Sequence, residues 1–305
     1  MNLKESPYFP RVRELLRILP YIGEEKSLAI KGGTAINLFV RDLPRLSVDI
    51  DLAYLPIESR SESLGKIRAA LVNIAAALKK YRPEYEIQNR DFENGKMMIG
   101  TAGGLIKIEV NTILRGSVFD PTQIELSRHA QELFEMEFSI TTLSMEDLYG
   151  GKICAALDRQ HPRDLFDIFL LYEDGGLTDN IRKAFIVYLL SHNRPIHELL
   201  DPRKTDFTST FQSEFEGLTE RTVTQRELEE TFDKLIADIR RNLTQNERQF
   251  ILTFKRGKPD WGLFSVAGVE RLPGIQWKLK NIAQMEKSRH ENQMRKLERV
   301  LGASP

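Results

Sequence analysis

The sequence lacks several features that mark particular classes of protein. It has one cysteine, Cys154, among 305 residues, so no disulfide can form within the chain and a reducing compartment is indicated. It has no apolar run of about 18 residues, the length that a membrane-spanning helix needs. No secretory signal opens the chain. We therefore expect a cytoplasmic protein that does not enter a membrane.

Net charge and several catalytic motifs are also missing. Lys plus Arg and Asp plus Glu each number 44, so the formal net charge is +0 and any nucleic-acid surface must be a local patch. The sequence has no G-x-x-x-x-G-K-[ST], H-E-x-x-H or G-x-S-x-G motif. P-loop NTPases, zinc proteases and Ser/His hydrolases therefore lack support. The five histidines show no metal-ligand spacing with Cys154.

The remaining composition is that of an ordinary globular protein, 41% hydrophobic and 29% charged, and the chain is long enough for two domains. The most informative stretch is Lys31–Tyr54. Its pattern predicts the end of a strand, a Gly-Gly turn, a short helix over residues 34–40 and a second strand over residues 46–54.

The Gly-Gly turn has properties that suit phosphate binding. Gly32 and Gly33 would let backbone N–H groups approach a phosphate with no Cβ in the way. Thr34 is expected to cap the following helix, whose N-terminus favours anions.

The second strand carries an acidic pair. Side chains alternate along a strand, so Asp49 and Asp51 share one face, and the apolar Val48, Ile50 and Leu52 share the other. About six acidic pairs at this spacing are expected by chance in such a composition. The pair is informative because it follows a glycine turn that could hold phosphates, while carboxylates suit hard divalent cations.

The motif Gly32-Gly33-Thr34-Ala35, followed by Arg45-Leu46-Ser47-x-Asp49-x-Asp51, resembles the active-site signature of the AbiEii/AbiGii toxin family. That family lies within the DNA polymerase beta-like nucleotidyltransferase superfamily. The resemblance implies that the turn and helix hold the nucleotide's phosphates and that the Asp-x-Asp strand binds two Mg²⁺ ions. This chain has Thr34 after a double glycine in place of Gly-Ser.

The rest of the first half predicts a sheet with covering helices. We expect helices over residues 11–19, ended by Pro20, and over residues 63–80. Strands are expected over residues 85–89, 96–101, 105–112 and 138–143, with the polar stretch before the last of them forming a loop. In the strand over residues 105–112, Lys107 and Glu109 share the face opposite Ile106, Ile108 and Val110. The resemblance makes Glu109 a third metal ligand, with an exposed structural acid as the equal alternative.

From Ser144 onward the pattern becomes helical. Ser144 and Asp147 form a capping-box-like start, and His161-Pro162 separates that helix from the next. Lys152 on the first helix and Asp167 on the second match the family's downstream motifs. The resemblance implies that Lys152 meets the triphosphate and that Asp167 belongs to the catalytic centre. Arg163 is a candidate nucleotide ligand, and Arg163 and Asp164 could equally serve only the helix start.

Further helices are expected over residues 179–192, 224–241, 244–255 and 274–300, with a polar linker over residues 201–219. The stretch from Lys278 to Arg299 has seven Lys/Arg against three Glu. A second basic cluster comprises Arg240, Arg241, Arg248, Lys255, Arg256 and Lys258. In a neutral chain these clusters could contact a nucleic-acid backbone, although such runs are more often solvated helix faces.

Taken with the resemblance, these observations predict an α+β protein. Residues 1–143 would form a polymerase-beta-like catalytic domain with a mixed sheet, and residues 144–305 a helical domain that contributes to the active site and to acceptor binding. The implied activity is Mg²⁺-dependent transfer of NMP from an NTP to an acceptor hydroxyl, with tRNA or another RNA as acceptor. The protein would be the toxin of a type IV-like toxin–antitoxin or phage-defence pair, with a cognate antitoxin as partner. Two alternatives stay open: a small-molecule acceptor, and an inactive nucleotide- or RNA-binding module.

Overall fold

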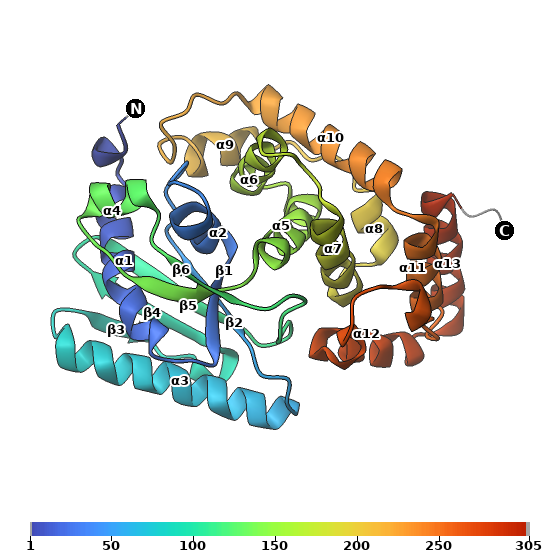
Figure 1. Cartoon of the computed structure of the whole chain (residues 1–305), viewed down its shortest axis with the longest axis horizontal. Coiled ribbons are helices and arrows are strands. Elements are labelled where there is room, and N and C mark those ends of the chain that lie inside the picture. Colours follow the sequence, from blue (N-terminus) through green and yellow to red (C-terminus); the bar gives the residue numbers. More distant parts are fainter. Residues whose placement is uncertain (1, 303–305) are drawn as a thin grey trace. The chain divides into compact units, whose positions relative to one another are not determined.

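A computed structural model describes residues 2–302 of the chain (Figure 1). The chain divides into two compact units. The first comprises the residues up to Leu148 together with Gln212–Thr222, and the second comprises Tyr149–Phe211 and the chain from Val223 onward. The segment Gln212–Thr222 thus returns to the first unit, where Leu46 N donates to Leu218 O at 2.8 Å. The sequence pattern had placed most of this segment in a polar linker.

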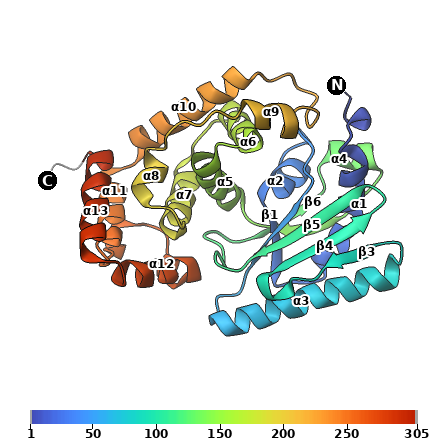
Figure 2. The ribbon, with the colours of Figure 1, turned by 180° about the vertical axis from the view of Figure 1, so that it is seen from behind.

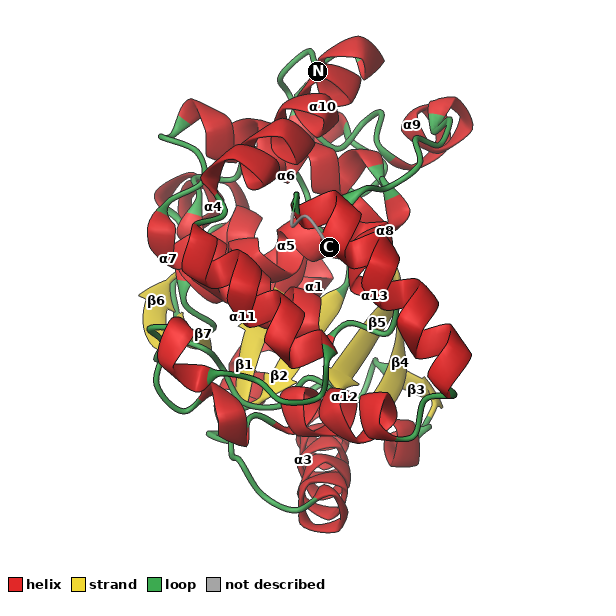
Figure 3. Cartoon of the chain, turned by 90° about the vertical axis from the view of Figure 1, so that its right-hand side faces the viewer, coloured by secondary structure: helices red, strands yellow, loops and turns green. Residues whose placement is uncertain are grey.

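A seven-stranded mixed sheet organises the first unit, in the strand order β3-β4-β5-β2-β1-β7-β6. The strands are β1 Leu28–Lys31, β2 Ile50–Tyr54, β3 Glu86–Asn89, β4 Lys96–Thr101, β5 Gly104–Asn111, β6 Thr122–Glu125 and β7 Ser139–Thr142. The β2–β5 and β1–β7 pairs are parallel and the other pairs are antiparallel. In Figure 3 the strands lie side by side in one layer. The α+β class expected from the sequence is confirmed.

Helices cover both faces of this sheet. They are α1 Phe9–Gly23, α2 Gly32–Ala35 with the π-helical turn η2 Ile36–Val40, α3 Arg60–Tyr81 and α4 Arg128–Phe134, with the short 3₁₀ turns η1 Leu3–Glu5 and η3 Phe92–Asn94. α3 lies along one face and α2 on the other (Figures 1 and 2). The β-strand side chains Ile50, Leu52, Ile106 and Ile108 are fully buried, which confirms the alternation expected for both strands.

Three expectations for the first unit are wrong. Pro20 lies inside α1, which continues to Gly23. The strand expected from residue 46 begins at Ile50, because Leu46 N bonds to Leu218 O outside the sheet. The stretch expected to be a loop forms β6 and α4; β6 pairs with β7, so its ordering comes from a partner strand more than from its own polar sequence.

The second unit is helical. Its helices are α5 Met145–Arg159, which begins in the first unit, α6 Pro162–Glu173, α7 Asp179–Ser191, α8 Ile196–Leu200, α9 Thr208–Glu214, α10 Gln225–Asn242, α11 Gln245–Lys255, α12 Pro273–Ala283 and α13 Lys287–Leu301, with 3₁₀ turns η4 Trp261–Leu263 and η5 Val269–Arg271. Ser144 Oγ accepts from Asp147 N at 3.1 Å, which confirms the expected start of α5. Within residues 2–302, no helix is long and apolar enough to cross a membrane.

The single long helix expected over residues 274–300 is wrong. α12 ends at Ala283 and α13 begins at Lys287. The Glu286 carboxylate accepts from Ser288 N and Arg289 N, so it caps a new helix in place of continuing the first. The basic residues of this stretch therefore lie on two separate helices.

Candidate active site

The glycine turn packs directly against the acidic pair. Gly32 has φ of +69°, in the left-handed region that glycine adopts without strain. A Cβ at Gly32 would lie 2.8 Å from Asp51 Oδ2, and one at Gly33 would lie 2.8 Å from Arg45 Nη2 and 3.1 Å from Ser47 Oγ. Both glycines are therefore needed for close packing, in addition to any contact with phosphate. Arg45 and Ser47 are part of the motif, but the sequence alone indicates no role for them.

Thr34 does not act as the expected helix cap. The helix begins at Gly32 with Lys31 at the capping position, and no side chain caps it. The Thr34 hydroxyl instead donates to the carbonyl oxygen of Asp49 at 2.5 Å and lies 3.0 Å from Ser47 Oγ. Thr34 is buried. Its hydroxyl therefore fixes the backbone immediately before β2 and so helps to orient the acidic pair.

The acidic pair belongs to a charged cluster on the α2 face of the sheet. Asp51 is in register with Glu109 on the parallel strand β5. Asp49 lies one residue before β2, and its Oδ1 is 3.2 Å from Nη2 of Arg11 on α1. Glu109 forms ion pairs with Lys107 and, at 3.5 Å, with Lys96. The side chains of Asp49 and Glu109 are 40% and 32% exposed, so the cluster is open to solvent.

Lys107 and Glu109 stabilise each other's charged forms within the cluster. Partial burial raises the pKa of Glu109, but the ammonium groups of Lys107 and Lys96 outweigh burial and the net shift is downward. The hydrogen bond to Glu109 raises the pKa of Lys107, and the nearby Asp51 and Asp49 act in the same direction. The cluster therefore holds three carboxylates against three ion-paired cations.

The donor set suits a hard divalent cation. Asp49, Asp51 and Glu109 offer carboxylate oxygens, the ligands that Mg²⁺ prefers. Within residues 2–302, no group of three or more His, Cys, Asp or Glu side chains is already gathered as a metal site. Arg11, Lys107 and Lys96 hold two of the three carboxylates, so a metal would have to compete with these cations for its ligands.

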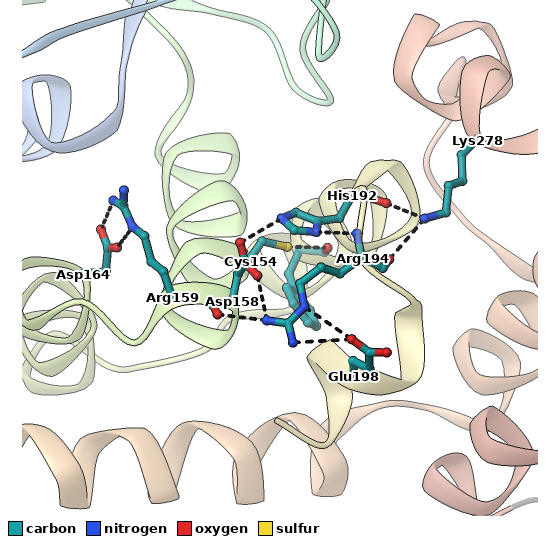
Figure 4. A network of polar contacts seen from close by, with 9 residues as sticks. Cys154, Asp158, Arg159, Asp164, His192, Arg194, Glu198 and Lys278 are labelled. Carbon is teal, nitrogen blue, oxygen red and sulfur yellow. Dashed lines mark hydrogen bonds and ion pairs between the residues drawn. The ribbon is translucent and has the colours of Figure 1, made fainter. Parts of the chain in front are cut away.

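A second cluster of predicted site residues lies in the second unit. Lys152 on α5 is 6% exposed, and its Nζ lies 2.8 Å from Asp164 Oδ1 and 3.0 Å from Asp167 Oδ2 on α6. Arg159 also binds Asp164, at 2.6 and 3.1 Å (Figure 4). Burial raises the pKa of Asp164, but Lys152 and Arg159 outweigh it and hold that pKa well below its usual range.

This cluster separates residues that the sequence treated alike. Asp164 is part of the buried ion-pair network, whereas the Arg163 guanidinium lies 3.4 Å from the ring of His161. The helix start is capped by His161, whose Nδ1 accepts from Arg163 N at 3.1 Å. Asp164 therefore does more than begin a helix, while Arg163 contacts His161, the residue that caps the helix.

The two basic clusters are partly used for packing. Lys278 is buried, and its ammonium donates to the carbonyl oxygens of His192 and Arg194, the latter at 3.1 Å (Figure 4). Lys255 is also buried and donates to Gln293 Oε1 at 2.6 Å. Burial lowers the pKa of each lysine to about 8. Neither ammonium is placed to contact a nucleic acid.

All four arginines of the cluster between residues 240 and 258 have partners within the chain. Arg240 pairs with Asp201, Arg241 with Asp238 and Arg256 with Glu298. Arg248 donates to backbone carbonyls, including that of Leu301 at 2.9 Å. In contrast, several cations of α12 and α13 are exposed: Lys280, Lys287, Arg289, Arg295, Lys296 and Arg299.

Comparison with known proteins identifies the family of the chain. The family described as "Nucleotidyl transferase AbiEii toxin, Type IV TA system" matches residues 14–281. The chain belongs to the AbiEii family of nucleotidyltransferase toxins. It is therefore a nucleotidyltransferase toxin of a type IV toxin–antitoxin system, and the resemblance seen in its motifs is confirmed.

A solved structure gives the same fold. MenT4, a nucleotidyltransferase toxin from Mycobacterium tuberculosis H37Rv, matches with a TM-score of 0.62 at 13% identity, over 92% of this chain and 96% of MenT4. At that identity the match concerns the fold. No curated protein matches the sequence. The glycine turn, the acidic pair, Lys152 and Asp167 of this AbiEii toxin all fall within the matched range.

Proposed function

We propose that this toxin transfers an NMP from an NTP to a hydroxyl group of an RNA, first of all a tRNA, with Mg²⁺ as cofactor. The observation that carries the proposal is the packing of the glycine turn against Asp51, beside Asp49 and Glu109 on one face of the sheet. A phosphate-binding turn and a set of hard oxygen ligands then lie in direct contact.

Within the first unit, Asp49 and Asp51 are the proposed metal ligands, and Glu109 is the third candidate. Bound Mg²⁺ would supply positive charge that offsets the charge developing on the phosphates. Gly32 and Gly33 would present backbone N–H groups to the triphosphate, and Thr34 would keep Asp49 oriented through its bond to the Asp49 carbonyl.

Within the second unit, Asp167 is the proposed group that positions or deprotonates the attacking hydroxyl. Its carboxylate lies 3.0 Å from the ammonium of Lys152, and a carboxylate is a group that can accept a proton from a hydroxyl. The positive charge of Lys152 is proposed to act on the departing pyrophosphate, because neutralising that charge lowers the barrier of phosphoryl-transfer reactions. Arg163 remains a proposed nucleotide contact.

The test is an incorporation assay with each α-labelled NTP, Mg²⁺ and total RNA. We expect label in RNA for the wild-type chain, and less than about a tenth of that rate for Asp49→Asn or Asp51→Asn, a loss above roughly 1.4 kcal/mol. Asp120→Asn is the matched control, since Asp120 is exposed outside the sheet. Label in a small acceptor would favour the small-molecule alternative. No label with any NTP would favour an inactive binding module.

The exposed cations of α12 and α13 are the proposed contacts for the acceptor's phosphates. An antitoxin is the counterpart that the family implies. We further propose that the toxin acts in the cytoplasm and contributes to abortive phage defence. Growth arrest on expression, relieved by the antitoxin and lost in Asp49→Asn, would test this cellular role.

A further inference from the structure

Charged side chains form an ordered row across four adjacent strands. The registers pair Lys31 of β1 with Asp51 of β2, Asp51 with Glu109 of β5, and Glu109 with Lys96 of β4. Residues in register share a face of the sheet, so the row has the order plus, minus, minus, plus. The two carboxylates at its centre are the proposed metal ligand Asp51 and the third candidate ligand Glu109.

Lys107 lies beside this row and within the carboxylate cluster. It precedes Ile108, which is in register with Ile50, so continuing the register by one residue brings Lys107 next to Asp49. Its ammonium bonds to Glu109 and also interacts with Asp51 and Asp49. Arg11 Nη2 on α1 also lies close to Asp49, 3.2 Å from its Oδ1.

Metal binding would leave these two cations without their present partners. The positive charge of a bound Mg²⁺ offsets that of the carboxylates that coordinate it, and the metal repels a nearby ammonium or guanidinium. The incoming triphosphate is an anion that can replace the lost partners, and Lys and Arg bind phosphate oxygens well. Arg11 has an additional reason to move, since within residues 2–302 its buried Nε has no hydrogen-bond partner.

We infer that Lys107, assisted by Arg11, exchanges partners during the reaction cycle. When metal is absent, its ammonium pairs with the carboxylates. Once metal is bound to the carboxylates, its ammonium binds the phosphates of the NTP. This inference rests on the proposed metal site at Asp49 and Asp51. Lys107 would then lower the affinity for metal when no nucleotide is present, and raise the affinity for NTP when metal is bound.

Removing the Lys107 charge should therefore shift two affinities in opposite directions. In Lys107→Met, Mn²⁺ alone should bind more tightly, by about fivefold, which is the scale of a half-exposed ion pair. Non-hydrolysable α,β-imido analogues of the NTPs, with Mg²⁺ present, should bind about tenfold more weakly, because a charged hydrogen bond to phosphate is lost. A merely structural lysine would weaken both or neither.

Titration calorimetry on the full chain measures both affinities, with a melting curve to verify that each variant is folded. Lys79→Met is the matched control, since Lys79 is an exposed lysine on α3, which covers the face of the sheet opposite α2 (Figures 1 and 2). Lys107→Arg keeps the charge and should retain the wild-type Mn²⁺ affinity. If Lys107→Met changes the Mn²⁺ affinity and the NTP-analogue affinity in the same direction, or changes neither, the inference is overturned.

The same titrations separate this inference from the proposed function. Asp49→Asn should abolish Mn²⁺ binding if the metal site is correct. If Asp49→Asn binds Mn²⁺ like the wild type, the metal-site proposal fails whatever Lys107 does. If Asp49→Asn loses Mn²⁺ while Lys107→Met leaves both affinities unchanged, the metal site stands and only the partner exchange is refuted.

Discussion

Replacing Lys152 by Met tests the buried ion-pair cluster of the second unit. Lys152 is 6% exposed and pairs with Asp164 and Asp167, which are 1% and 0% exposed. Met conserves most of the side-chain volume, so little packing is lost. The variant therefore leaves two buried carboxylates in place of a compensated network.

The expected loss follows from the partners that remain. Removing one member of a buried ion pair costs about 3–5 kcal/mol. Because Arg159 still binds Asp164 through two hydrogen bonds, the lower end of that range applies, about 3 kcal/mol. For a unit of this size, 1 kcal/mol corresponds to about 2–4 °C, so the melting temperature should fall by about 6–12 °C.

Thermal and urea melts of the full chain measure this loss, with Arg159→Met as the control. The Arg159 side chain is 60% exposed, and Asp164 keeps Lys152 when Arg159 is removed, so the control should lose about 1 kcal/mol or less. Adding Asp167→Asn to Lys152→Met should restore part of the loss, since it removes the buried negative charge that loses its ion pair with Lys152, whereas Asp164 keeps Arg159. A Lys152→Met variant within 1 kcal/mol of the wild type would refute this account of the cluster.

Three further predictions concern other parts of the chain. Gly32→Ala should abolish nucleotidyl transfer, because the added Cβ would displace the Asp51 carboxylate. Its free energy of unfolding should stay within about 2 kcal/mol of the wild-type value. A variant with more than half of the wild-type activity would contradict this. Because Lys278 has a lowered pKa, between about pH 8 and 10 it is neutral in the folded chain but still protonated in the unfolded chain. The unfolded chain then binds more protons, so the free energy of unfolding should rise with pH, by about 1–2 kcal/mol more in the wild type than in Lys278→Met. Equal pH slopes in the two proteins would exclude the lowered pKa. Changing Arg295, Lys296 and Arg299 to Gln should make the plot of log binding constant for RNA against log salt concentration less steep, by about two to three, without lowering stability. An unchanged slope would show that α13 does not contact the RNA.

The alternation of apolar and polar residues predicted several strands of the sheet from the sequence. β4 covers the residues expected for it, 96–101, and β5 differs from its expected range by one residue at each end. Ile106, Ile108 and Val110 are buried, and Lys107 and Glu109 share the opposite face, as the period of two requires. The position of Glu109 beside Asp51 could not be read in the same way, because register between strands distant in sequence leaves no local signal.

Errors arose where tertiary contacts decide the outcome. Pro20 was read as a helix end, but α1 accommodates it three residues before its own end. In α12 the aromatic Trp277 is 38% exposed, while the charged Lys278 beside it is 7% exposed, the reverse of what their polarity indicates. Lys278 donates to two backbone carbonyls, and such partners at a distance in the chain are invisible to hydrophobic periodicity.

The family motif owes part of its spacing to packing. Gly32 has a left-handed backbone, and a Cβ there would push against Asp51 Oδ2, while a Cβ at Gly33 would push against the side chains of Arg45 and Ser47. Thr34 in turn bonds to the carbonyl of Asp49. Each residue of the turn therefore contacts a residue of the acidic segment, so a change on either side would displace its partner. The turn and the acidic pair work as one unit because their positions are set by direct contact, before any nucleotide or metal binds.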